Sequence, residues 1–179
     1  MGLFDFFRKN KASNQDVTIN KPEVELNEIV EEFDNVDYLG KAASAGTKAK
    51  QAVKNKKYDK AWKLFHEQKE MYAMHANRSG FTARQALALD SQVHEELGNI
   101  LRAEGKHLDA FNHILYWVCC NNNRPIQKHE QKLRAYFNRC KLKNVSLDTV
   151  INYSLQQWDE PYTFLQARDQ VAQWSLINN

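Results

Sequence analysis

Two stretches of this chain repeat one pattern of small and large residues. Residues 56–65 read KKYDKAWKLF, and residues 105–114 read GKHLDAFNHI. Each stretch has an alanine (Ala61 or Ala110) that is followed at once by an aromatic residue, and a large apolar residue stands four positions after the alanine. Residues three or four apart share one face of an α-helix, and a small residue on that face leaves room for a second helix. The repeated pattern therefore predicts pairs of closely packed helices.

Few residues in the chain favour tight turns, since only 6 of the 179 are glycine and 3 are proline. β-Sandwiches and β-barrels need such turns at short, regular intervals. Apolar residues instead recur at helical spacing along most of the chain, and no segment has a convincing strand pattern. We therefore predict an all-α protein built of antiparallel helical hairpins, because short turns between long helices make neighbouring helices antiparallel.

Turn and capping residues set the bounds of the predicted helices. Gly105 can adopt the left-handed conformation that ends a helix, and Ser146 is a suitable N-cap. Pro22 and Pro161 suit the first turn of a helix. One helix is predicted from Pro22 to about residue 33, another lies within the lysine-rich segment 41–63, and six more are expected over about 58–75, 81–104, 108–120, 126–141, 147–157 and 161–177.

The second of the two repeated units resembles the tetratricopeptide repeat. That family has a leucine–glycine pair in the first helix, a glycine at the turn, and an alanine and an aromatic residue in the second helix. Leu97, Gly98, Gly105 and Ala110 stand at those spacings, and Ile114 replaces the aromatic residue. The resemblance implies that small side chains such as Gly98 let the two helices cross at close range.

The first unit matches the same pattern in part, and the resemblance covers roughly residues 42–125. Ala49 takes the small first-helix position, Lys56 replaces the turn glycine, and Ala61 and Phe65 fit. The alanines of the two units are 49 residues apart rather than about 34, so the helices must be longer than in the family. The resemblance implies hairpins stacked as a right-handed superhelix, and an irregular helical bundle is the alternative.

Composition divides the chain into two parts. Residues 1–20 form an N-terminal amphipathic segment with a polar linker, and residues 21–179 form a single all-helical domain that resembles tetratricopeptide repeats. Within this domain, residues 126–157 lack a convincing glycine–alanine pair, and the helix over 161–177 is expected to cap the stack. The chain has three cysteines, two of them adjacent, which is a poor disulfide framework and favours a reducing, cytoplasmic location.

The sequence contains no local motif for catalysis, for a cofactor or for a metal ion. A zinc site needs three or four converging ligands, and the histidines and cysteines lack the usual spacings. His113, His129, Cys119, Cys120 and Cys140 are therefore interpreted as structural residues. We expect a protein that is not an enzyme and that holds no cofactor or metal.

The charge pattern does not favour nucleic acid as a partner. The net charge of +3 is too small to indicate nucleic-acid binding by itself. The lysine-rich segment 41–63 follows an acidic stretch, residues 23–37, which could neutralise it. The aromatic residues Tyr58, Trp62 and Phe65 have the spacing of core positions rather than that of stacking platforms.

The resemblance implies that the protein binds another protein or a peptide, as an adaptor or scaffold. Hairpins of this kind stack into a concave surface, and in the family each first helix faces its inside. The exposed first-helix positions that match this surface are Lys50 and Lys54 in the first unit and Asn99 and Arg102 in the second. Their charge favours an acidic or C-terminal peptide, which they would bind through charge-assisted hydrogen bonds.

A second hypothesis places the protein at a membrane. Leu3, Phe6 and Phe7 would share one face of a short N-terminal helix, with Phe4 nearby, and basic residues follow. This arrangement is typical of an interfacial helix, so residues 3–7 could anchor a peripheral adaptor at the inner face of the membrane. A third hypothesis is a toxin-neutralising immunity protein or phage accessory protein of the bacterial cytosol, although no residue indicates its target.

Overall fold

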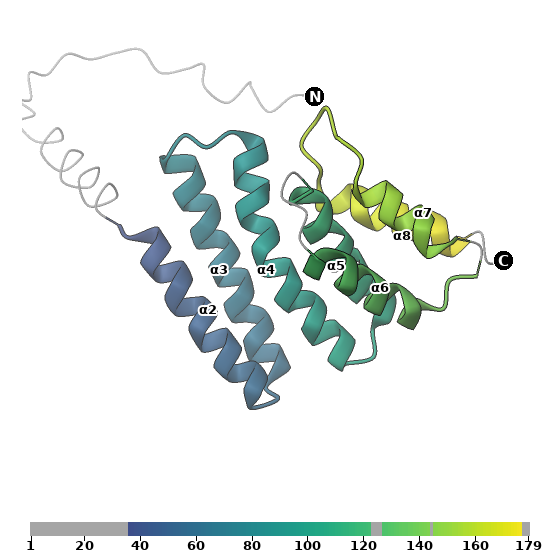
Figure 1. Ribbon diagram of the computed structural model, residues 1–179. Coiled ribbons are helices and arrows are strands. Elements are labelled where there is room, and N and C mark those ends of the chain that lie inside the picture. Colours follow the sequence, from purple (N-terminus) through teal and green to yellow (C-terminus); the bar gives the residue numbers. More distant parts are fainter. Residues whose placement is uncertain (1–35, 123–126, 144, 177–179) are drawn as a thin grey trace, which may run out of the picture. The chain divides into compact units, whose positions relative to one another are not determined.

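The computed structural model describes residues 36–122, 127–143 and 145–176 (Figure 1). These residues form seven α-helices and contain no strand, which confirms the all-α prediction. All of them except Val36 belong to one compact unit, Asp37–Asn179. The helix predicted from Pro22, and Leu3, Phe4, Phe6 and Phe7, lie outside the described residues.

The helices follow one another as α2 (Tyr38–Lys54), α3 (Tyr58–Arg78), α4 (Ala83–Ala103), α5 (His107–Cys120), α6 (Gln127–Cys140), α7 (Leu147–Ser154) and α8 (Phe164–Leu176). Figure 1 shows α2, α3 and α4 side by side, and α5 to α8 come after them in the sequence. Helices α3 and α4 have 21 residues each, so the prediction of unusually long helices is confirmed.

Hydroxyl side chains begin three of the helices. The Ser146 hydroxyl accepts a hydrogen bond from the Thr149 N–H at 3.1 Å, which confirms the predicted N-cap of α7. Thr82 begins α4 and Thr163 begins α8, and each pairs reciprocally with the glutamine three residues later. The prediction that Pro161 occupies the first turn of the last helix is wrong, because Thr163 supplies the cap and α8 begins after it.

The α2–α3 turn and the α4–α5 turn have the same backbone conformation. Lys56 and Gly105 stand at equivalent positions with positive φ values of 56° and 78°. The next residue in each turn, Lys57 or Lys106, donates its N–H to the carbonyl five residues earlier, at 2.9 Å in both cases. Glycine adopts this left-handed conformation readily, whereas lysine seldom does. The repeated sequence pattern thus corresponds to a repeated turn.

The small residues of the repeated pattern lie where helices touch. Ala49, Ala61 and Ala110 are all fully buried. A Cβ atom added to Gly98 would lie 3.2 Å from the carbonyl oxygen of Ala110 and 3.2 Å from Cδ1 of Ile114. The close crossing of α4 and α5 that Gly98 predicts is therefore present.

Two hydrophobic clusters form the core. The cluster of the first three helices consists of Ala49, Ala52, Ala61, Phe65, Val93, Leu97 and Ile100. The larger cluster is centred on α5, against which α4, α6 and α8 pack. Trp117 and Trp174 are buried in the larger cluster, and Trp62 and Trp158 pack against it. These four tryptophans thus serve the packing of the helices.

The remaining helices complete the core around α5. Helix α6 also ends at a residue with positive φ, Lys141 (52°), and turns back into α7. Helix α8 packs on α5 through buried residues such as Val171 and Trp174, and the rings of Trp174 and Phe111 lie 6.3 Å apart between centroids. The last described helix therefore covers α5.

Candidate functional site

The first helices of the three hairpins, α2, α4 and α6, are joined by polar side chains. Lys50 on α2 forms an ion pair of 3.7 Å with Glu96 on α4. Glu95 on α4 pairs with Lys128 at 2.7 Å and with Lys132 at 3.2 Å, both on α6. We call the surface of α2, α4 and α6 that carries these ion pairs the first-helix face.

Asn99 and Arg102 lie beside Tyr136 on the first-helix face. The Tyr136 hydroxyl donates to Asn99 Oδ1 at 2.6 Å, and Lys132 donates to the same oxygen at 3.2 Å. The Asn99 amide donates to Glu96 at 3.3 Å. The Arg102 guanidinium lies 5.7 Å from the centroid of the Tyr136 ring, within the range of a cation–π contact. Asn99 thus uses most of its hydrogen-bonding capacity within the protein, while Arg102 is exposed.

A cavity of about 650 Å³ lies between the end of α2 and the start of α3. We call it the lysine groove, and its lining consists of Thr47, Lys48, Lys50, Gln51, Ala52, Lys54, Asn55, Lys57, Lys60 and Leu64. Half of these residues are lysines, and none is acidic. Lys50 pairs with Glu96, whereas the other groove lysines form no ion pair with a described residue. The groove therefore carries positive charge that the described residues leave largely uncompensated.

The four residues predicted to bind a partner divide between these two places. Lys50 and Lys54 line the lysine groove, whereas Asn99 and Arg102 contact Tyr136. Lys50 links the two places, because its partner Glu96 also accepts the hydrogen bond from Asn99. The other groove lysines are not among the predicted residues, although the density of lysine in this part of the sequence is the signal that indicates them.

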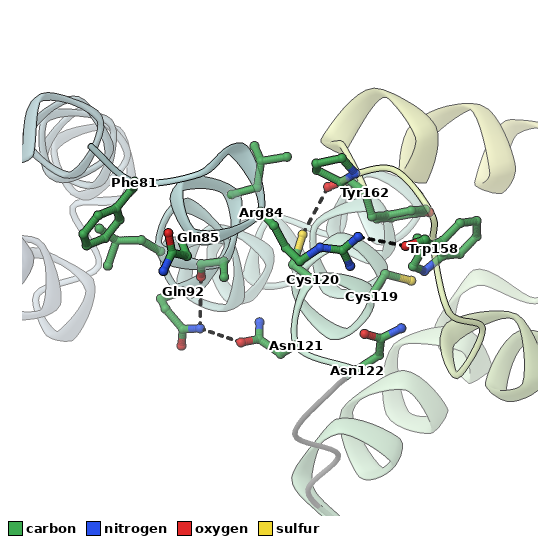
Figure 2. A pocket seen from close by; sticks show the side chains of 14 residues that line it. Phe81, Arg84, Gln85, Gln92, Cys119, Cys120, Asn121, Asn122, Trp158 and Tyr162 are labelled. Carbon is green, nitrogen blue, oxygen red and sulfur yellow. Dashed lines mark hydrogen bonds between the residues drawn. The ribbon is translucent and has the colours of Figure 1, made fainter. Parts of the chain in front are cut away.

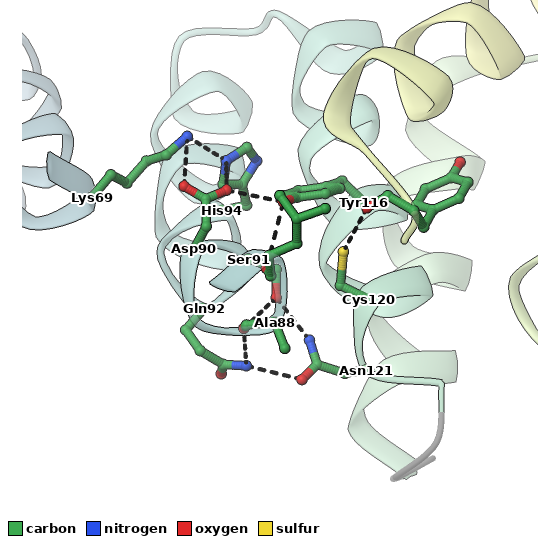
Figure 3. Close-up of polar contacts among 11 residues, drawn as sticks. Lys69, Ala88, Asp90, Ser91, Gln92, His94, Tyr116, Cys120 and Asn121 are labelled. Carbon is green, nitrogen blue, oxygen red and sulfur yellow. Dashed lines mark hydrogen bonds and ion pairs between the residues drawn. The ribbon is translucent and has the colours of Figure 1, made fainter. Parts of the chain in front are cut away.

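A second polar cluster joins α3, α4 and α5 (Figure 3). Lys69 Nζ lies 2.7 Å from His94 Nε2 and 3.3 Å from Asp90 Oδ1. The Tyr116 hydroxyl donates to Asp90 Oδ2 at 3.0 Å. Burial opposes ionisation of Asp90, but its hydrogen bonds and the Lys69 charge outweigh burial and lower the pKa of the carboxyl group. The carboxylate thus ties the three helices together.

His94 and His113 are buried side by side within this second cluster. Their ring centroids are 4.7 Å apart, and Phe164 of α8 contacts both rings. Burial lowers the pKa of His94, and it lowers the pKa of His113 to about 2, so the His113 ring is neutral near pH 7. His94 Nε2 lies between Lys69 Nζ at 2.7 Å and Asp90 Oδ2 at 3.4 Å. Because only 1% of His94 is exposed, a substrate has no access to this ring.

The thiols of Cys119, Cys120 and Cys140 are free and at least half-buried. Burial raises the pKa of each thiol, to about 12 for Cys120 and for Cys140. The nucleophilic and metal-binding form of cysteine is the thiolate, which these surroundings disfavour. Among the described residues, no group of three or more His, Cys, Asp or Glu side chains could hold a metal ion.

Another cavity, of about 550 Å³, lies where α4, α5 and the segment between α7 and α8 meet (Figure 2). We call it the amide pocket, because four carboxamide side chains line it: Gln85, Gln92, Asn121 and Asn122. Its lining comes from segments that are far apart in the sequence, at residues 81–92, 119–122 and 158–162. No local motif in the sequence indicates this pocket.

Comparisons with protein-family models, with curated protein sequences and with solved structures find no significant match. No helix in the described part of the chain has both the length and the apolar character needed to cross a membrane.

Proposed function

We propose that this protein is a non-enzymatic interaction module that binds an acidic segment of a partner protein in the lysine groove. The observation that carries the proposal is the groove itself, where lysines from the end of α2 and the start of α3 surround one cavity without an acidic neighbour in its lining. A carboxylate that enters the groove gains charge-assisted hydrogen bonds, which are roughly twice as strong as neutral ones.

The lining of the groove favours a peptide over a nucleic acid. No aromatic side chain lines it, so bases have no platform on which to stack. Ala52 and Leu64 contribute apolar surface between the ammonium groups, which suits the mixed side chains of a polypeptide. The resemblance of residues 42–125 to tetratricopeptide repeats also supports a peptide ligand and an adaptor role in the cytoplasm.

The first-helix face could extend the binding surface beyond the groove. Lys50 lines the groove and is paired only loosely with Glu96, at 3.7 Å on an exposed surface. Arg102 is exposed above Tyr136 and could meet a second carboxylate of the same peptide. Asn99 then acts as a positioning residue, because its hydrogen bonds hold Tyr136 and Glu96.

The test is fluorescence anisotropy with a fluorescein-labelled peptide of alternating glutamate and serine. We expect the double variant Lys54→Glu/Lys60→Glu to bind at least about tenfold more weakly, because two attractive charges become repulsive. The matched control is Lys41→Glu/Lys63→Glu, which changes the net charge equally at exposed lysines on α2 and α3 outside the groove.

The two double variants separate a specific groove from general charge attraction. If both lose the same affinity, the peptide responds to net charge alone and the proposed site is wrong. Tighter binding of a labelled oligothymidine than of the peptide would instead make nucleic acid the ligand. Binding in the groove should also weaken as sodium chloride is raised, since exposed charges are screened.

Membrane contact by Leu3, Phe4, Phe6 and Phe7 remains a separate proposal from the sequence, because these residues lie outside the described part of the chain. Deletion of residues 2–11 should abolish co-sedimentation with anionic liposomes if this segment is an interfacial anchor. Unchanged co-sedimentation after the deletion would contradict it. An immunity protein or phage accessory protein would have the same binding role, with one specific protein as its partner.

A further inference from the structure

We propose that the amide pocket is a second binding site, which takes a small, uncharged, planar aromatic ligand with an amide-like edge. This inference is independent of the proposed function, because the pocket shares no lining residue with the lysine groove. The volume of about 550 Å³ falls in the range of sites for small organic ligands.

The walls of the pocket provide surfaces for a flat ring. Phe81, Trp158 and Tyr162 line it, together with the aliphatic side chains of Leu87, Leu89 and Pro161. Phe81 is 38% exposed, although it contacts the ring of His75, so part of a large apolar side chain stays open to solvent here. Offset or edge-on contacts between aromatic rings add about 0.5–1.5 kcal/mol beyond the burial of apolar area.

The carboxamides offer both donors and acceptors to a ligand. Gln92 donates to Ala88 and Asn121, which leaves its Oε1 without a partner among the described residues. Asn122 donates to the Gln156 carbonyl, and its Oδ1 is likewise unused by the described chain. Gln85 accepts from Thr82 through its oxygen and keeps its amide hydrogens for another acceptor. An amide group carries the complementary donor and acceptor.

The lining favours a neutral ligand over a carboxylate, because a carboxylate has no hydrogen to donate to the free Oε1 of Gln92 and Oδ1 of Asn122. Arg84 is the one charged residue of the lining, and it donates through one nitrogen to the carbonyls of Trp158 and Asp159 at 2.9 Å and 3.0 Å. No carboxylate lines the pocket, so a cation finds no partner there. Burial also raises the pKa of Cys119 and Cys120, which keeps both thiols uncharged.

Hydrogen bonds between distant segments hold the walls in place, as Figure 2 shows. Arg84 ties the start of α4 to the segment before α8, and the Cys120 thiol donates to the Tyr162 carbonyl at 3.3 Å. Asn121 links the end of α5 to Ser91 at 3.0 Å. The pocket is thus formed before a ligand binds, which reduces the conformational entropy that the side chains lose on binding.

The test uses four related probes on the ¹⁵N-labelled full chain, with chemical shifts followed by NMR. Benzamide is neutral, planar and carries an amide; benzoate is anionic, benzamidine is cationic, and cyclohexanecarboxamide has no aromatic ring. We expect benzamide to saturate shifts of the Gln92 and Asn122 side-chain amides and of the Trp158 indole. The other three probes should bind at least about fivefold more weakly, since each lacks one required property.

Two matched variants show whether the pocket itself is responsible. Ala88→Phe should fill the cavity and abolish the benzamide shifts, whereas Ala83→Phe, an exposed position on the same helix outside the lining, should leave them unchanged. If Ala88→Phe fails to fold, Phe81→Ala serves instead and should weaken benzamide at least about threefold.

Three outcomes would overturn the inference. The first is the absence of pocket shifts with benzamide, and the second is equal binding of benzamidine or cyclohexanecarboxamide. The third is a peptide with one phenylalanine between glycines that binds tenfold more tightly than benzamide, because the site would then take a polypeptide rather than a small molecule.

Discussion

The α2–α3 hairpin and the α4–α5 hairpin share a turn and a pattern of small residues, but they bury very different side chains. Helix α2 buries only alanine and glycine, at Ala42, Ala45, Gly46, Ala49 and Ala52. Helix α5 buries nine of its 14 residues, among them Phe111, Tyr116 and Trp117. Among the described helices, the first hairpin packs only against α4, whereas α5 is covered by α4, α6 and α8.

Under the proposed function, this difference separates binding from stability. The first hairpin leaves a lysine-lined cavity at its end, where four of the five lysines form no ion pair with a described residue. The second hairpin holds most of the large apolar side chains, and its Asp90 and His94 pair with Lys69 of α3. We therefore expect substitutions in the second hairpin to lower the free energy of unfolding, and charge changes in the first to alter binding with little effect on folding.

The largest effect is expected when the aromatic residue that follows the repeated alanine is removed. Phe111→Ala should lower the free energy of unfolding by about 3–5 kcal/mol, because the ring is fully buried. Trp62 is its half-buried equivalent in the first hairpin, and Trp62→Ala should lower the free energy of unfolding by about half as much. Urea denaturation measures both values. Equal losses would show that the two hairpins contribute equally to the core.

Acid should act on the second hairpin through its buried histidines. The pKa of His113 is about 2 in the folded protein and about 6.5 in the unfolded chain, so below pH 6.5 only the unfolded chain takes up this proton. Stability should therefore fall as the pH is lowered below 6.5, with a slope that approaches about 1.4 kcal/mol for each pH unit at pH 4.5. His94, whose pKa is also lowered, adds to the fall with the same sign.

The variant His113→Phe tests this pH dependence. Its free energy of unfolding, measured by urea titration at pH 6.5, 5.5 and 4.5, should fall less steeply than that of the unchanged protein. Parallel curves for the two proteins would mean that His113 is accessible to protons in the folded state.

A smaller effect is expected at the equivalent small residues Gly98 and Ala49. Gly98→Ala gains about 1 kcal/mol of helix propensity but forces a methyl group against the Ala110 carbonyl, so the net result should be a loss of about 1 kcal/mol. Ala49→Gly removes a buried methyl group and should also cost about 1–2 kcal/mol. A more stable Gly98→Ala protein would show that α4 and α5 can move apart at no cost.

The smallest effect is expected for the ion pair between the first helices of the two hairpins. Lys50→Ala should change stability by less than about 0.5 kcal/mol, because the Lys50 side chain is 63% exposed and water screens the pair. The difference in melting temperature between the Lys50→Ala variant and the unchanged protein should be nearly the same at low and at high salt. A loss above 1 kcal/mol would place Lys50 among the residues that hold the fold.

The helices could be predicted because their signals are local. Apolar spacing, the Ser146 cap and the glycine turn at Gly105 each depend on residues a few positions apart, and each is present in the structure. Lys56 and Lys141 also end their helices in the left-handed conformation, but lysine carries no local signal for it. Pro161 misled the prediction because a nearby threonine with a matching glutamine is the stronger helix start.

The candidate sites were predictable only in part, because their residues meet through the fold. The sequence predicts Lys50 and Lys54 on the first-helix surface, and both line one cavity. Asn99 contacts Tyr136 because α4 packs beside α6. The sequence pattern does not predict this packing. The amide pocket combines three distant segments, so its residues show no shared spacing.

The order of α5 and α8 along the chain has a consequence for how the protein is made. The ribosome synthesises α2 to α5 before residues 164–176. Until those residues are present, the surface of the histidine pair that contacts Phe164 is exposed to water, and so is the surface of Phe111 that contacts Trp174. The nascent chain can close its first hairpin early, but the interior of the second hairpin is covered only once α8 has been synthesised. A chain that stopped before Phe164 would thus expose apolar surface that chaperones and proteases recognise.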